Sequence, residues 1–135
     1  TDHSTMTRVL AFGTFDGLHP GHLHYLRQAK RQGDELVVVV ARDATVERTK
    51  GARPQYQETW RRDQLLLLPE VDQAVLGRLH DQQGIIQELM PKVICLGYDQ
   101  EAFTQGLAER YPWVQILRLE PYQPQRYKSS FLRAA

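Results

Sequence analysis

The alternation of short apolar runs with helix-type segments is the feature that most constrains the fold of this chain. The apolar runs have the length and composition of buried strands and span 7–12, 35–41, 71–77, 92–97 and 113–119. The segments between them show helical spacing or helix-ending residues and span 20–34, 56–69, 81–91 and 100–111. The run ELVVVVA at 35–41 is apolar on both faces, as a central parallel strand is. The pattern predicts an α/β fold, namely a Rossmann-like, open five-stranded parallel sheet with helices on both faces.

The polar segments after three of the strands are the candidates for a binding site. In open parallel sheets, ligands bind beyond the carboxyl ends of the strands. The segments 13–22, 42–53 and 97–100 all fall at that edge. We expect the second of them to belong to a loop over 43–55, with no more than a helical turn at 44–48, because it is polar and ends in Gly and Pro.

Composition excludes several classes of protein. With 135 residues and a net charge of +1, the chain is predicted to form a single domain over 6–135, preceded by a short leader at 1–5. The absence of long runs of one charge gives no support to a nucleic-acid or membrane partner. A single cysteine, Cys95, excludes an internal disulfide and a cysteine-based zinc site, and it is expected in the core. No signal peptide or membrane-spanning run is visible, so a cytoplasmic location is expected.

The stretch AFGTFDGLHPGH at 11–22 concentrates the chemistry of the chain. Gly13 allows a sharp turn after the first strand, and Pro20 is suited to the first turn of a helix. Free backbone N–H groups and the positive end of the helix dipole then face one cavity, which suits phosphate. His19 and His22 flank the helix start, where imidazoles can donate to phosphate oxygens. The alternative is a chance pair or a fragment of a metal site, although the spacing is not that of a zinc helix and no third ligand is evident.

The same stretch, read as GTFDGLHPGH, resembles the phosphate-binding motif of the small HxGH-type nucleotidyltransferases, which include cytidylyltransferases and flavin adenylyltransferases. The resemblance runs over 7–133. It implies that the loop and both histidines hold a nucleoside triphosphate, with contacts from Gly13, Thr14, Phe15, His19, Gly21 and His22. Asp16 is expected to tie the loop together, the alternative being a solvated acid.

Basic residues further along the chain are candidates for neutralising the phosphates. Lys50 lies in the segment that leaves the second strand, where the family has a basic residue; the alternative is an ordinary solvated lysine. Arg61 and Arg62 lie on the 56–69 helix. We expect one of them to reach the site and the other to pair with Glu58.

The segment LGYDQ at 96–100 follows the fourth strand. Gly97 permits a close approach of the backbone, and Asp99 is suited to accept hydrogen bonds from a ribose or a base amine. Capping of the next helix is the alternative role for Asp99, and the two roles are compatible. The resemblance favours a nucleotide contact for both residues.

The segment YKSSFLR at 127–133 resembles a late serine-rich motif of the same family. Ser129 or Ser130 is expected to cap a final helix over 128–135, which would present a second helix N-terminus to phosphate. Arg133 matches the basic residue of that motif. Lys128 stands where the family often has a serine, and a lysine there could also meet phosphate.

The resemblance implies direct transfer of a nucleoside monophosphate from a triphosphate to a phosphate-bearing acceptor, with release of pyrophosphate. It also implies Mg²⁺ carried by the triphosphate, with no protein metal ligands. The segments ARDATVERTKG, VDQAVLG and LGYDQ look similar to archaeal-type FAD synthetases, which favours ATP and FMN. Two alternatives remain open: a CTP-dependent cytidylyltransferase acting on glycerol 3-phosphate or a similar small phosphate, and a non-catalytic nucleotide-binding module.

Trp60 and the run Leu65–Leu68 are consistent with a homodimer contact or, equally, with a buried helix.

Overall fold

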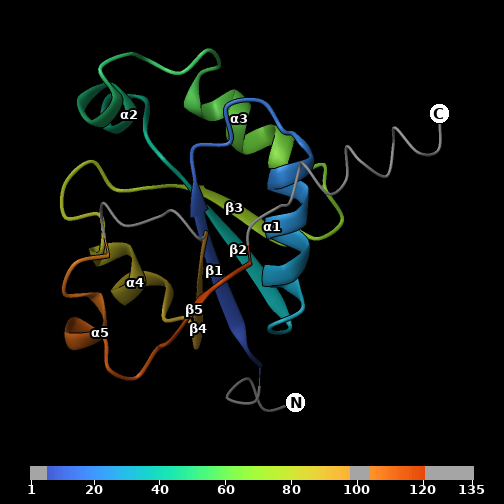
Figure 1. The fold of residues 1–135 in the computed structure, drawn as a ribbon, viewed down its shortest axis with the longest axis vertical. Helices are drawn as coiled ribbons and strands as arrows, with labels where there is room; N and C mark the ends of the chain where they lie inside the picture. Colours follow the sequence, from blue (N-terminus) through green and yellow to red (C-terminus); the bar gives the residue numbers. More distant parts are fainter. Residues whose placement is uncertain (1–5, 98–103, 121–135) are drawn as a thin grey trace.

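The computed structural model describes residues 6–97 and 104–120. Its centre is a five-stranded sheet of order β3-β2-β1-β4-β5, with every neighbouring pair parallel (Figure 1). The strands are β1 Arg8–Gly13, β2 Glu35–Val40, β3 Gln73–Leu76, β4 Val93–Leu96 and β5 Gln115–Arg118. The helices are α1 Pro20–Lys30, α2 Asp43–Lys50, α3 Glu58–Leu65, α4 Gly84–Leu89 and α5 Leu107–Arg110. The predicted fold class is confirmed.

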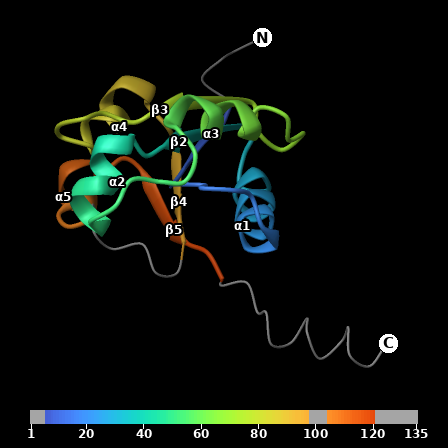
Figure 2. The same cartoon turned by 90° about the horizontal axis from the view of Figure 1, so that it is seen from above.

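Helices cover both faces of the sheet, and each face has its own apolar cluster. Val9 and Ala11 of β1 point to the side where α1 and α3 bury Leu26, Ala29 and Leu65. Leu10 and Phe12 point to the opposite side, where they pack with residues of α4 and α5. Figures 1 and 2 show these two helices on the side of the sheet away from α1. This alternation is the two-residue period of a strand buried on both sides. Cys95 lies in the first cluster with no exposed surface, and burial raises the pKa of its thiol to about 12.

Segment 43–55 differs from the sequence-based expectation. Its first part forms the eight-residue helix α2 rather than a loop with a single turn, and Lys50 ends this helix. Thr45 and Val46 are buried, and Gly51 closes the helix in the left-handed conformation at φ 81°. The sequence did not predict the helix because most of its residues are polar and only Thr45 and Val46 are buried. The helix that begins at Pro20 also ends earlier than predicted, at Lys30.

Strand β1 lies between β2 and β4. The chain first adds β2 and β3 on one side of β1 and then crosses over to add β4 and β5 on the other side. The pairing of β1 with β2 continues to Gly13 and Val40. Its pairing with β4, among the described residues, ends earlier at Ala11 and Cys95. A reversal of strand order of this kind opens a crevice at the carboxyl ends of the strands. No helix in 6–97 or 104–120 is long and apolar enough to cross a membrane.

Candidate active site at the first strand-to-helix turn

The two histidines of the motif cap the start of α1 by binding each other's backbone. His19 is the N-cap residue, and its Nδ1 accepts hydrogen bonds from the N–H groups of Gly21 at 3.0 Å and His22 at 3.3 Å. In return, His22 Nδ1 accepts from His19 N–H at 3.3 Å. The two rings stack with centroids 3.6 Å apart. This is a capping box in which imidazoles replace the usual hydroxyl and carboxylate.

This arrangement determines the tautomer of both rings. An Nδ1 atom that accepts a backbone hydrogen bond carries no proton, so the proton of the neutral ring lies on Nε2. Each histidine therefore has Nε2–H as its donor, and the ring of His22 also hydrogen-bonds the Gly17 backbone. The first turn of α1 contains no acidic residue, so nothing there offsets the positive end of the helix dipole. The turn is suited to an anion.

His22 is neutral at physiological pH because its pKa is low. Burial, together with the adjacent His19 ring, lowers the pKa of His22 to about 4, against a smaller opposite effect from the Gly17 backbone. The ring therefore acts as a hydrogen-bond donor rather than as a permanent cation. A bound polyanion would favour the protonated form, because an opposite charge nearby raises the pKa of an imidazole.

Gly13 and Phe15 shape the loop through packing. Phe15 is a buried residue in the left-handed region, at φ 54°. Its ring lies so close to Gly13 that a Cβ atom there would be 2.7 Å from a ring carbon. The edge of the same ring contacts His22, with centroids 5.2 Å apart. Gly13 is thus required by the position of Phe15, and a left-handed phenylalanine next to a candidate site is the kind of strain that functional loops hold.

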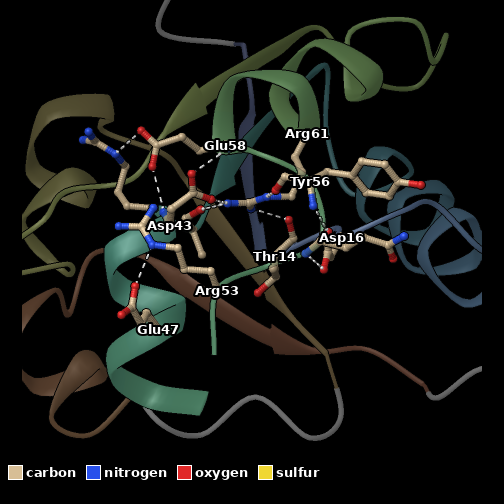
Figure 3. A network of polar contacts seen from close by, with 11 residues as sticks. Thr14, Asp16, Asp43, Glu47, Arg53, Tyr56, Glu58 and Arg61 are labelled. Carbon is tan, nitrogen blue, oxygen red and sulfur yellow. Dashed lines mark hydrogen bonds and ion pairs between the residues drawn. The ribbon is translucent and has the colours of Figure 1, made fainter. Parts of the chain in front are cut away.

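Asp16 ties the first loop to the segment that precedes α3. Its carboxylate accepts hydrogen bonds from the backbone N–H of Gln55 at 2.7 Å and of Tyr56 at 2.9 Å (Figure 3). This role matches the expectation that Asp16 holds the loop together. It brings the segment that follows Lys50 beside the loop between β1 and α1.

Arg61 is a fully buried cation at the centre of the network in Figure 3. Its guanidinium donates to the carbonyl oxygens of Thr14 at 2.7 Å, Ala41 at 2.9 Å and Tyr56 at 2.9 Å, and to Asp43 Oδ1 at 2.7 Å. Although burial alone would raise it, the pKa of Asp43 is lowered, because Arg61 and the Glu58 backbone donate to its carboxylate. One side chain thereby joins the ends of β1 and β2, the start of α2 and the segment before α3.

The expected pairing of Glu58 was wrong. Glu58 binds Arg42, with Nε and Oε2 3.0 Å apart, and accepts from Asp43 N–H at 2.7 Å. Arg62 pairs with Asp63 on the surface instead. Arg61 does not pair with Glu58 because its buried guanidinium donates to acceptors from several other elements. A sequence signal for this existed, since Arg61 precedes the buried Leu65 by one helical turn.

Half of the predicted site residues lie together in one loop. This group surrounds the start of α1 and comprises Gly13, Thr14, Phe15, Asp16, His19, Gly21 and His22. Lys50 is exposed at the end of α2, and Gly97 follows β4, where its carbonyl accepts from Arg118 at 2.9 Å. The remaining predicted residues lie outside the described ones and are Asp99, Lys128, Ser129, Ser130 and Arg133. Ligand contacts for all these residues stay a prediction.

A second opening lies at the same edge of the sheet. It is a cleft of about 430 Å³ between the end of α2 and the segment that follows β3. Its lining is mostly polar and includes Arg48, His80, Gln82 and Gln83. In the part of the chain that is described, no three His, Cys, Asp or Glu side chains are grouped to hold a metal ion.

Comparison with known proteins agrees with this geometry. A family model described as cytidylyltransferase-like matches residues 10–135. An FAD synthase of Aciduliprofundum boonei is 46% identical over 121 residues, covering 87% of this chain and 80% of that protein. An FAD synthase of Thermoplasma acidophilum is 42% identical over 132 residues, covering 95% and 92%.

Solved structures extend the comparison. The lipopolysaccharide core biosynthesis protein of Thermoplasma volcanium superposes with a TM-score of 0.79 at 42% identity, covering 87% of this chain and 99% of that one. Pantoate-beta-alanine ligase of Francisella tularensis, at 15% identity and a TM-score of 0.62, shares the fold; the match covers 88% of this chain and 61% of that one. With a motif-bearing turn at the switch point of a parallel sheet and a family match over most of its length, this chain belongs to the cytidylyltransferase-like family of nucleotidyltransferases.

Proposed function

We propose that this protein transfers the adenylyl group of ATP to the phosphate of FMN, forming FAD and releasing pyrophosphate. The observation that carries the proposal is the mutual capping of His19 and His22, which leaves an Nε2–H donor on each ring at the start of α1. The FAD synthase names of the similar proteins support the choice of ATP and FMN.

The proposed reaction is a direct in-line displacement. An oxygen of the FMN phosphate attacks the α-phosphorus of ATP, a new P–O bond forms, and the bond to the bridging oxygen breaks as pyrophosphate leaves. Such transfers depend on positioning and on neutralising charge rather than on a covalent nucleophile. The imidazole donors and the helix start would stabilise the charge that builds up on the phosphate oxygens.

Other basic groups add to this neutralisation in the proposal. Lys50 ends α2. The segment after α2 is hydrogen-bonded to Asp16, which lies in the loop between β1 and α1. We assign Lys50, Arg133 and Lys128 to the phosphates, and Asp99 with Gly97 to the nucleoside. The serines 129 and 130 would present backbone and hydroxyl donors to the same phosphates.

A divalent metal, proposed here as Mg²⁺, would arrive bound to the triphosphate. Imidazoles that offer N–H donors cannot ligate a metal through the same atoms, so the histidine pair fits phosphate oxygens better than a protein-held ion. Mg²⁺ usually keeps several waters and binds through substrate phosphates, which is consistent with this assignment.

We place the acceptor at the cleft between α2 and the segment after β3. The cleft lies at the same edge of the sheet as the loop between β1 and α1. Its volume of about 430 Å³ is within the range of ligand pockets. The side chain of Gln82 offers an amide donor and an acceptor, which suit the pyrimidine edge of a flavin.

A pyrophosphate-release assay tests the proposal. The purified protein is incubated with ATP or CTP, each against FMN or glycerol 3-phosphate, in the presence of Mg²⁺. We expect release only with ATP and FMN, with FAD detected by chromatography. Release with CTP and glycerol 3-phosphate would favour the cytidylyltransferase alternative, and no release with any pair would favour a nucleotide-binding module.

The predictions about assembly and location stay open to test. Leu65 is fully buried and Leu68 packs on the same core, which accounts for half of the apolar run. Leu67 is 76% exposed and Trp60 is 40% exposed, so a homodimer through this surface is still proposed. The cytoplasmic location also stays a prediction.

A further inference from the structure

The hydroxyl of Tyr25 lies where strands β1 and β4 stop pairing. Tyr25 is on α1, one turn after His22. Its Oη donates to the Cys95 carbonyl of β4 at 2.6 Å and accepts from Phe12 N–H of β1 at 3.1 Å. The Phe12 carbonyl is 3.4 Å away. A helix side chain therefore bonds the backbone of both strands at one point.

That point marks the opening of the crevice. Pairing of β1 with β4 ends at Ala11 and Cys95, whereas pairing of β1 with β2 continues to Gly13 and Val40. The Tyr25 hydroxyl thus stands at the last paired residues on the side where strand order reverses. In open parallel sheets this is the place where nucleotides enter.

The ring of Tyr25 is connected to the histidine pair through Phe15. The Tyr25 and Phe15 rings stack with centroids 6.4 Å apart at 26°. The Phe15 ring meets His22 edge-on at 5.2 Å, and His22 stacks on His19 at 3.6 Å. A continuous series of four rings therefore runs from the strand crevice to the N-cap of α1.

We propose that Tyr25 is a positioning residue for nucleotidyl transfer, which sets the place of His22 relative to the β1–β4 crevice. The proposal rests on the proposed function for its catalytic consequence. The hydroxyl anchors α1 to both strands, and the ring supports Phe15 and, through it, His22.

A packing role alone does not require the hydroxyl. A phenylalanine would bury the same ring, and a buried hydroxyl costs free energy unless it is hydrogen-bonded. Burial raises the pKa of Tyr25, so the hydroxyl keeps its proton and remains a donor to the Cys95 carbonyl across the working range of pH. What the hydroxyl adds beyond packing is a fixed position of α1 relative to β1 and β4.

The test compares two substitutions that remove the same atom. Tyr25→Phe removes the anchoring hydroxyl and keeps the ring. Tyr111→Phe is the control for the titration of His22, because Tyr111 is buried on the other face of the sheet, away from the histidine pair, and its hydroxyl donates to the Gln83 carbonyl at 2.9 Å. Both variants are measured for kcat and KM in pyrophosphate release, and the pKa of His22 is measured by NMR titration of its ring protons.

We expect kcat of Tyr25→Phe to fall roughly tenfold with little change in KM, since small misplacements of a donor are costly in the transition state. The pKa of His22 should move upward from about 4 in Tyr25→Phe, as its burial against Phe15 relaxes, and stay unchanged in Tyr111→Phe. An equal pKa of His22 in the two variants, or a kcat of Tyr25→Phe equal to that of the wild type, would overturn the proposal. A change in only one of the two measurements would also overturn it, because the effect must pass through His22.

The titration separates this proposal from the proposed function. If the wild-type protein releases no pyrophosphate, the assignment of the reaction fails. The His22 titration then decides the positioning role without any substrate: a shift confined to Tyr25→Phe supports it, and no shift overturns it.

Discussion

The buried guanidinium of Arg61 donates a 2.7 Å hydrogen bond to the carbonyl oxygen of Thr14, in the loop that carries the phosphate-binding motif. The same group binds Asp43 at the start of α2. The position of the loop is therefore coupled to a second helix through one side chain. This coupling makes Arg61 a test of whether the loop is held in advance of substrate binding.

Arg61→Ala should destabilise the protein strongly. Removing one partner of a buried ion pair costs about 3–5 kcal/mol, because the remaining polar groups lose their partner in a dry environment. We expect the lower half of that range, since the Asp43 side chain keeps 18% exposure to water. Urea unfolding followed by circular dichroism measures the change.

Arg62→Ala is the matched control for this prediction. Arg62 lies on the same helix, but its contact with Asp63 is on the surface, and such pairs contribute about 0–1 kcal/mol. Equal destabilisation by the two variants would show that the buried network of Arg61 has no special weight.

His19→Asn should separate capping from catalysis. Asparagine is a good N-cap, so the helix start and the stability of the protein should be kept within about 1 kcal/mol. The Nε2–H donor is lost, and kcat should fall roughly a hundredfold, which is the effect of removing one preorganised donor. The assay is pyrophosphate release under saturating ATP and FMN.

His24→Ala serves as the comparison within the same helix, since His24 lies outside the predicted motif contacts. It should retain nearly the wild-type kcat. Near-normal turnover in His19→Asn would remove the role assigned to the histidine pair.

Stability should depend on pH through His22. Its pKa is about 4 in the folded protein and about 6.5 in the unfolded chain, so the unfolded chain binds more protons between these values. The contribution is fully present above pH 6.5 and is lost as the pH falls toward 4. The urea midpoint should therefore decline over this window, and less so in His22→Gln. An equal decline in both proteins would assign the dependence to other groups.

The acceptor site is tested by Gln82→Ala in the cleft after β3. Loss of one amide contact to the acceptor should raise the KM for FMN several-fold, on the scale of about 1 kcal/mol for a hydrogen bond, and leave the KM for ATP unchanged. Steady-state kinetics with each substrate varied in turn measures both values. A rise in the KM for ATP alone would place the nucleotide, not the flavin, in this cleft.

Much of the fold was predictable because its signals are local. The five apolar runs each became a strand, since a strand buried on both faces needs an uninterrupted apolar sequence. Helix α2 was missed because its stability comes from contacts with Glu58 and from the burial of Val46, which no local pattern reveals. Helix ends were also displaced, because capping and packing rather than periodicity decide them.

The candidate site divides in the same way. Sequence alone determined that a glycine turn and two histidines stand between a strand and a helix, because spacing and residue type are local properties. Only the tertiary structure decided what these residues contact. The bonds from Arg61 to Thr14 and the contacts of Tyr25 with Phe12 and Cys95 join groups that are far apart in the sequence, so their approach depends on the packed chain. Hydrogen bonds of this kind require distances within a few tenths of an ångström, and only the folded arrangement of the sheet and its helices supplies them.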